Sequence, residues 1–187
     1  MGAYLIAILA GVAYGGADQY LGSLRLMVLL GSWTPTASQM SAPWLLLPFV
    51  LGSTQVRPRR AMVLGFVTTQ AALLGYFAMT LSPIEGVPLA GVPAGAVALL
   101  HENSVYIVGG LVTGPLYGLL GHRWRVRRWW VSAALVAGAL CLEPGARVAA
   151  GRLFPPSIVW AAEVVFGALI AVYFAHRLLS HRRAAVA

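Results

Sequence analysis

Lysine is absent from this sequence, and acidic residues are scarce. The 187 residues include 13 basic residues, all of them arginine, and 5 acids, which gives a formal net charge of +8. Charged residues make up only 10% of the chain, against about 25% in an ordinary soluble domain. Hydrophobic residues reach 59%, and the mean hydropathy is +0.79. Water cannot solvate that much apolar surface on so small a chain, so the composition excludes a disordered chain, a coiled coil and a water-soluble globule.

Cysteine and the common catalytic motifs are also missing. Cys141 is the only cysteine, which excludes an internal disulfide, and no Cys/His spacing suits a metal site. The 4 histidines are scattered along the chain. The sequence contains no GxSxG, HExxH or P-loop motif, no Ser/Lys pair, and no Asp-rich cluster of the kind that prenyl-diphosphate enzymes use. We therefore expect no metal site and no cofactor.

What the sequence does contain is a series of long apolar stretches. At roughly 20 residues per membrane-spanning helix, the chain holds about six spans joined by short loops. The expected spans cover residues 2–21, 36–55, 61–81, 99–121, 129–142 and 157–176, with a short interfacial segment at 23–31 and a loop from 143 to 156. We expect an all-α fold: residues 1–187 form a single integral membrane domain, a polytopic helix bundle that contacts the lipid bilayer.

The arginines indicate how this bundle is oriented. Ten of them lie in three clusters, which follow the second, fourth and sixth expected spans: Arg57, Arg59 and Arg60; Arg123, Arg125, Arg127 and Arg128; Arg177, Arg182 and Arg183. This is the positive-inside pattern of a membrane protein rather than a nucleic-acid-binding patch. With an even number of spans, both termini are expected in the cytoplasm, and the protein is expected to be multi-pass in a bacterial plasma membrane.

The acids map to the opposite half of the expected bundle. Asp18, Glu85, Glu102 and Glu143 fall at outer span ends or in outer loops, and Glu163 lies inside the last span. Because ionisable groups in a membrane favour a bundle interior or a wet cavity, we expect an outward-opening polar pocket. Its candidate ligand-binding residues are Asp18, Gln19, Gln39, Trp44, His101, Glu102, Asn103, Glu143, Trp160 and Glu163.

Structural explanations exist for several of these features. Glu143 is one helical turn from Arg147 and could simply form an ion pair with it. The small residues Ala3, Ala7, Gly11 and Gly15 repeat every fourth position, which lets helices approach closely. That stripe is interpreted either as packing within the bundle or as a docking face for a membrane partner.

Three functions follow from this pattern. The first is a small-molecule binding or transport protein, whose acidic and aromatic pocket selects a cationic or hydrogen-bonding solute. The second is a membrane enzyme, a cyclase or isomerase acting on an isoprenoid or lipid-like substrate, with Glu102, Glu163 and Asp18 as acid and base. The third is a membrane scaffold protein, in which the polar groups only hold the bundle together.

Short motifs carry a resemblance to known proteins. These are Ser41-Ala42-Pro43-Trp44 running into residues 48–52, the glycine-rich segment 114–121, and the basic, tryptophan-bearing turn after it. The chain resembles a family of small six-span membrane proteins of unknown function, found mainly in actinobacteria, and the resemblance implies no activity. More loosely, it is similar to the substrate-binding subunits of energy-coupling-factor vitamin transporters, which bind a ligand near the outer face. Their first helix docks the coupling subunit through an AxxxA motif, which Ala3 and Ala7 match in kind.

Overall fold

The computed structural model describes residues 2–88, 91–151 and 157–186, and these residues form helices with no strand among them. The helices are α1 (Gly2–Leu21), α2 (Leu24–Leu30), α3 (Trp33–Ser38), α4 (Ala42–Ser53), α5 (Pro58–Thr80), the short 3-10 helix η1 (Pro83–Glu85), α6 (Val92–Glu102), α7 (Ser104–Arg127), α8 (Trp130–Ala149) and α9 (Ser157–Val186). The expected all-helical fold is confirmed for this part of the chain.

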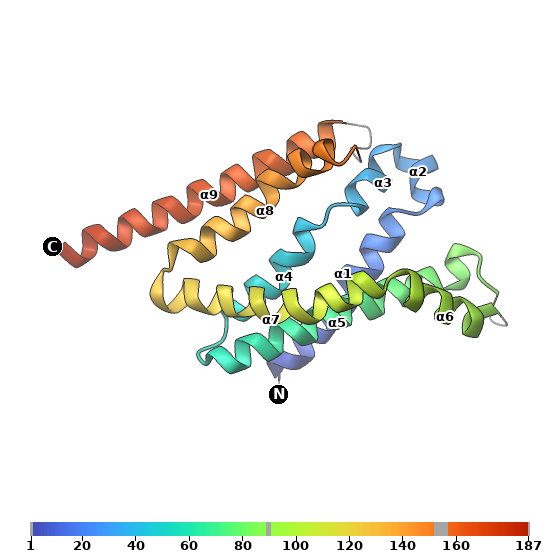
Figure 1. Cartoon of the computed structure of the whole chain (residues 1–187), viewed down its shortest axis with the longest axis horizontal. Coiled ribbons are helices and arrows are strands. Elements are labelled where there is room, and N and C mark those ends of the chain that lie inside the picture. Colours follow the sequence, from blue (N-terminus) through green and yellow to red (C-terminus); the bar gives the residue numbers. More distant parts are fainter. Residues whose placement is uncertain (1, 89–90, 152–156, 187) are drawn as a thin grey trace.

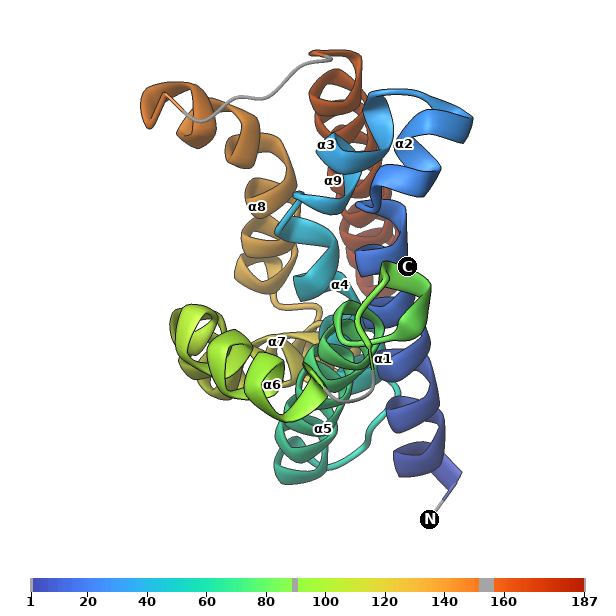
Figure 2. The same cartoon turned by 90° about the vertical axis from the view of Figure 1, so that its right-hand side faces the viewer.

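The long helices run alternately toward two ends of the bundle (Figure 1). The turns that join α4 to α5 and α7 to α8 lie at one end, together with the C-terminal end of α9. Figure 2 views the molecule from the other end, where α2, α3 and α6 lie. We call the first the arginine end, because the clusters at 57–60 and 123–128 fall there, and the second the acidic end.

Helices α1 and α5 are parallel neighbours that approach each other through small residues. Ala7, Gly11 and Gly15 are buried on the face of α1 that meets α5. A methyl group at Gly15 would overlap the backbone carbonyl of Ala72, and one at Gly75 would overlap that of Val12. The stripe that was a candidate docking face for a membrane partner is therefore covered by α5 and serves packing within the bundle, as small residues do in membrane helices.

Helix α7 uses a second glycine stripe to pack against both α5 and α4. A methyl group at Gly114 would crowd Thr69 of α5, and one at Gly118 would overlap the carbonyl of Ala61. On the side toward α4, a methyl group at Gly121 would overlap the backbone carbonyl of Phe49. Four helices, α1, α5, α7 and α4, are thereby joined backbone to backbone.

Helices α8 and α9 form an antiparallel pair that joins the others through an apolar core (Figure 1). Phe49 of α4, Trp124 of α7 and Phe174 of α9 are buried there, and the Trp124 and Phe174 ring centroids lie 4.5 Å apart. Val136 of α8 completes this core. This core lies toward the arginine end. Other contacts therefore have to hold the acidic ends of α8 and α9 against the rest of the bundle.

The outer surface of the bundle is apolar. Large side chains such as Leu5 on α1, Val112 on α7 and Val172 on α9 are exposed. Four helices among the described residues are long and apolar enough to cross a membrane: Pro58–Thr80, Ser104–Arg127, Trp130–Ala149 and Ile158–Ser180. The protein is therefore a helical protein of membrane type, while the number of six spans stays a prediction.

The helix boundaries differ from the expected spans in several places. Residues 36–55 form two helices, α3 and α4, because the chain breaks at 39–41 and Pro43 begins a new helix in its first turn. The expected span 99–121 is divided at Asn103 between α6 and α7. Helices α8 and α9 extend beyond 129–142 and 157–176, so Glu143 and Arg147 lie on a helix rather than in a loop.

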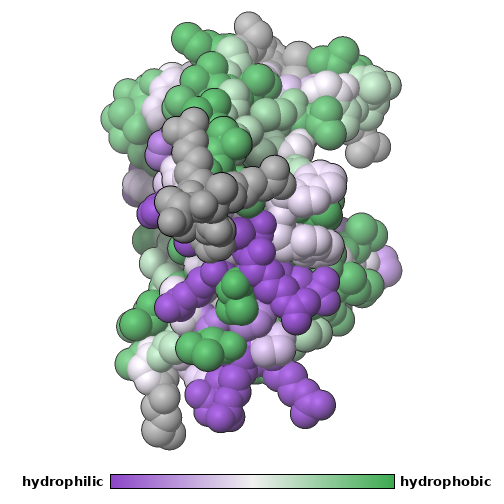
Figure 3. Space-filling model, turned by 90° about the vertical axis from the view of Figure 1, so that its left-hand side faces the viewer, coloured by the Kyte–Doolittle hydropathy of each residue, from purple (hydrophilic) through white to green (hydrophobic). Residues whose placement is uncertain are grey.

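The arginine end is held together by polar contacts between its turns. Arg125 of α7 donates from Nη1 to the carbonyl oxygens of Ser53 and Thr54, at 3.1 and 2.6 Å, and a ring nitrogen of His122 lies 2.9 Å from the carbonyl oxygen of Gln55. Figure 3 shows hydrophilic residues gathered on this end of the molecule. The side chains of Arg182 and Arg183, which belong to the third expected cluster, lie outside the described part of the structure.

Candidate functional site

The break between α3 and α4 is bound by a carboxylate from α8. The backbone N–H of Ser41 donates to Glu143 Oε1 at 2.8 Å, and that of Ala42 donates to Glu143 Oε2 at 2.7 Å. The first N–H groups of a helix have no partner within the helix, and the helix dipole makes this end favourable for an anion. Glu143 therefore caps α4, and it connects the acidic ends of α4 and α8.

Arg147, one turn further along α8, completes this connection. Its Nη2 lies 2.7 Å from Glu143 Oε1 in an ion pair, and its Nε donates to the same oxygen at 2.9 Å. Nη2 also donates to the carbonyl oxygen of Gln39 and, at 3.2 Å, to Ser41 Oγ. The guanidinium carbon lies 5.0 Å from the ring centroid of Trp160 on α9, within cation–π range. The expected ion pair is confirmed, and it holds α3, α4, α8 and α9 together.

Glu163 is the carboxyl in this region that has no hydrogen-bond donor. The residue is only 4% exposed, and neither carboxyl oxygen has a hydrogen-bond partner among the described residues. Within the described part of the chain, the charged groups close enough to act on it are Glu143 and Arg147. Its burial agrees with the prediction that a carboxyl inside the last span would face the interior of the bundle.

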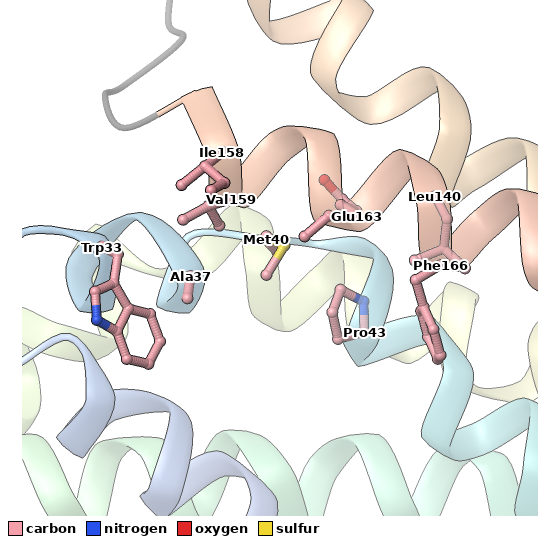
Figure 4. A pocket seen from close by; sticks show the side chains of 10 residues that line it. Trp33, Ala37, Met40, Pro43, Leu140, Ile158, Val159, Glu163 and Phe166 are labelled. Atoms are coloured by element: carbon pink, nitrogen blue, oxygen red, sulfur yellow. The ribbon is translucent and has the colours of Figure 1, made fainter.

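An apolar groove lies directly beside these residues (Figure 4). It has a volume of about 410 Å³ and separates α3 and the start of α4 from α9. Trp33 and Pro43 lie on one side of the groove, and Val159 and Phe166 lie on the other (Figure 4). Glu163 also lines it, but with its carbon stem, since its oxygens are buried. The groove thus offers an apolar surface with a charged cluster behind it.

A second cluster of polar and aromatic side chains surrounds Asp18, near the end of α1. Trp44 Nε1 donates to Asp18 Oδ2 at 3.3 Å. The Trp44 ring packs edge-on against Tyr14, with centroids 5.4 Å apart, and against Tyr76, at 6.1 Å. Tyr14 lies within electrostatic range of both Asp18 and Glu143. This aromatic cluster is therefore next to the Glu143 site, but its rings fill the space around Asp18.

Comparison with known proteins places the chain in a family. The sequence matches, over residues 1–187, a family described as a family of unknown function (DUF6518). The chain belongs to this family. No curated protein and no solved structure matches it. The resemblance to a family of unknown function is confirmed, whereas the actinobacterial distribution and the likeness to vitamin-transporter subunits have no support among these matches.

The predicted site residues of this DUF6518 member fall into three separate places. The first place is the break between α3 and α4, where four of them meet: Gln39, Glu143, Trp160 and Glu163. The second is the neighbouring aromatic cluster, which contains Asp18 and Trp44, with Gln19 half-buried nearby on α1. His101 and Glu102 are exposed at the end of α6. Asn103 donates to the carbonyl of Leu99 in that helix. Among the described residues, no contact given by the structure joins His101, Glu102 or Asn103 to the other predicted site residues.

Several residues of the site were not predicted. The groove-lining residues Ala37, Met40, Pro43 and Phe166 are ordinary apolar residues in sequence, and only the meeting of α3, α4 and α9 makes them a surface. Tyr14 is likewise recognisable only after α1 and α4 are packed together. Arg147 was detectable, because its spacing of four from Glu143 is that of an ion pair on a helix.

Proposed function

We propose that this protein is a membrane protein that binds a small molecule with an apolar body in the groove between α3, α4 and α9. The observation that carries the proposal is the groove itself: its volume, about 410 Å³, lies in the range of small-molecule sites, about 300–1,000 Å³, and Trp33, Pro43 and Phe166 give it apolar walls. Since α9, which forms one wall of the groove, is long and apolar enough to cross a membrane, the occupant would be a lipid-like molecule that enters from the bilayer.

The chemistry of the neighbouring groups supports an apolar rather than a cationic ligand. Asp18 is engaged by Trp44, and the rings around it pack against one another. Glu143 already accepts hydrogen bonds from Arg147 and from two backbone N–H groups. The acidic and aromatic pocket for a cationic solute, which the sequence favoured, is therefore the weaker proposal. The enzyme alternative is weaker too, because Asp18 and Glu102 do not line the groove and the Glu163 oxygens are buried behind it.

The proposal also includes the number and direction of the membrane crossings. We infer six membrane crossings, made by α1, the broken unit α3–α4, α5, α7, α8 and α9, because these elements run alternately between the two ends of the bundle (Figure 1). The positive-inside rule assigns the arginine end, and with it both termini, to the cytoplasm of a bacterial cell. The groove would then open in the outer half of the plasma membrane.

The ligand proposal is tested with a long-chain fatty acid that carries a photoreactive diazirine on its chain. The purified full-length protein in lipid nanodiscs is irradiated with the probe, and labelled peptides are located by mass spectrometry. We expect saturable labelling of α3, α4 and α9, with competition by the unlabelled fatty acid. Ala162 lines the groove and Ala161 next to it does not. Ala162→Phe should reduce the labelling several-fold, while Ala161→Phe should leave it unchanged. Labelling that is unsaturable and equal in both variants would contradict the proposal.

A further inference from the structure

Among the described residues, the carboxyl groups behind the groove, Glu143 and Glu163, outnumber the positive charge of Arg147 that can balance them. We propose that Glu163 and Glu143 hold one proton between them, so that the break between α3 and α4 contains a buried proton-binding site. The inference goes beyond the proposed ligand binding and does not depend on it, because it concerns groups that the groove does not expose.

The surroundings of Glu163 are unsuitable for a carboxylate anion. The residue is 4% exposed, and both oxygens are buried without a hydrogen-bond donor among the described residues. An ionised carboxylate in such a place loses its hydration and gains no hydrogen bonds in return. A neutral carboxyl avoids most of this cost, and it brings its own O–H donor.

Glu143 is suited to be the charged member of the pair. Its oxygens accept from the backbone N–H groups of Ser41 and Ala42 and from Nε and Nη2 of Arg147, at 2.7–3.0 Å. All of these donors favour the carboxylate form. Glu143 and Arg147 together are neutral, so among the described residues around the site an ionised Glu163 would add a negative charge that no cation balances.

The two carboxyl groups are placed to share the proton. Glu163 faces Glu143 closely enough for the side chains to interact directly. The Nη2 group of Arg147 also binds the Gln39 carbonyl and Ser41 Oγ, which keeps the guanidinium on the side of α3 and α4. With the proton on Glu163, that carboxyl is neutral, and the charges that remain are those of the Glu143–Arg147 ion pair.

The other elements packed around the pair add few titratable groups. From α3 and the start of α4, the groove-lining neighbours Trp33, Ala37, Met40 and Pro43 are not titratable. From α1, Tyr14 lies within electrostatic range of Glu143, and Asp18 lies beyond it on Trp44. In the part of the chain that the structure describes, the proton balance of the site is therefore set by Glu143, Arg147 and Glu163.

Loss of the proton has a structural consequence. When the O–H bond of Glu163 breaks and the proton passes to solvent, two carboxylates compete for one guanidinium. Their repulsion acts on Glu143, which caps α4. Deprotonation would therefore weaken the contact that joins α8 to the break between α3 and α4.

Infrared spectroscopy of the purified protein in nanodiscs tests the inference, because a protonated carboxyl has a C=O band separate from that of a carboxylate. We expect a protonated-carboxyl band at neutral pH that weakens as the pH rises. Glu163→Gln should remove this band and its titration, whereas Glu102→Gln, which alters an exposed acid, should retain both. If Glu163→Gln instead removes a carboxylate band at neutral pH, the proposal is wrong.

A chemical measurement on the unmodified protein covers the case in which a variant fails to fold. Dicyclohexylcarbodiimide is apolar and adds to protonated carboxyl groups, which increases the mass of the peptide by one carbodiimide. We expect labelling of the peptide that carries Glu163 or Glu143 at neutral pH, falling several-fold at alkaline pH. Labelling confined to the peptides with Glu85 and Glu102 would overturn the proposal. Neither readout uses a lipid ligand, so failure of the groove proposal is distinguishable from failure of this one.

Discussion

Glu143 Oε1 accepts a hydrogen bond of 2.8 Å from the backbone N–H of Ser41, a residue that lies 102 positions earlier in the chain. The contact makes the start of α4 depend on α8 rather than on its own flanking residues, since Ser41 makes no side-chain cap hydrogen bond. Glu143 also gives a hydrogen-bond acceptor to the backbone N–H of Ala42, the buried first residue of this 12-residue helix.

Replacement of Glu143 should therefore be among the most destabilising changes at the acidic end. Glu143→Ala removes the cap of α4 and leaves Arg147 without its ion-pair partner, and we expect a loss of about 2–4 kcal/mol in the free energy of unfolding. Thermal unfolding of the detergent-solubilised protein, followed by circular dichroism, measures this. Glu102→Ala is the matched control and should change the free energy by less than about 0.5 kcal/mol, as exposed substitutions do. Equal effects of the two changes would contradict the assigned role of Glu143.

The glycine contacts predict opposite effects of one substitution at two positions. Gly15→Ala places a methyl group against the Ala72 carbonyl and should destabilise the protein by about 1–3 kcal/mol. Gly138→Ala on α8 meets open space and should stabilise it by about 0.5–1 kcal/mol, because alanine favours a helix. The same unfolding measurement compares them. Similar midpoints for the two variants would mean that α1 and α5 are not in close contact.

The Trp44–Asp18 hydrogen bond can be separated from the ring packing around it. Trp44→Phe retains an aromatic ring against Tyr14 and Tyr76 but leaves the buried carboxyl without its indole donor, at a cost of about 1–3 kcal/mol. In the Asp18→Asn background the same change should cost less. A double-mutant cycle measures the difference, and strictly additive effects would show that the two side chains are not coupled.

The inferred topology predicts which end of the bundle faces the outside of the cell. In a Cys141→Ser background, single cysteines at Val56 and at Ile84, both exposed, report on the arginine end and on the opposite end. A membrane-impermeant maleimide added to intact cells should label Ile84→Cys, and should label Val56→Cys only after lysis. The reverse pattern would place the arginines outside and contradict the positive-inside assignment.

Sequence reasoning reached the helical fold because long apolar stretches, unlike site geometry, are a local property. It also predicted that Glu163 would face the bundle interior or a wet cavity, since ionisable groups in a membrane avoid lipid, and the residue is 4% exposed. The interruption at 39–41 was missed because membrane helices tolerate prolines, so the polar residues Gln39 and Ser41 and the following Pro43 were included in one expected span. The break is bound by Glu143, a residue from α8, and no local pattern shows that contact.

The site shows the same limit. Asp18, Glu102 and Glu163 were grouped by their expected depth in the membrane, which says nothing about position around the bundle. The structure separates Glu102, exposed on α6, from Glu163, buried against α8. The groove depends on side chains from α3, α4 and α9, whose apolar character is unremarkable until the three helices meet.

The parallel pairing of α1 with α5 also has a consequence for the order in which the protein assembles. The small-residue face of α1 has its packing partner on a helix that is synthesised only after α2, α3 and α4. During synthesis Gly11 and Gly15 therefore stay without this packing partner until α5 has been made. The N-terminal helix is thus the first to be made but gains this packing partner only when α5 follows, so changes in α5 should act on the biogenesis of α1.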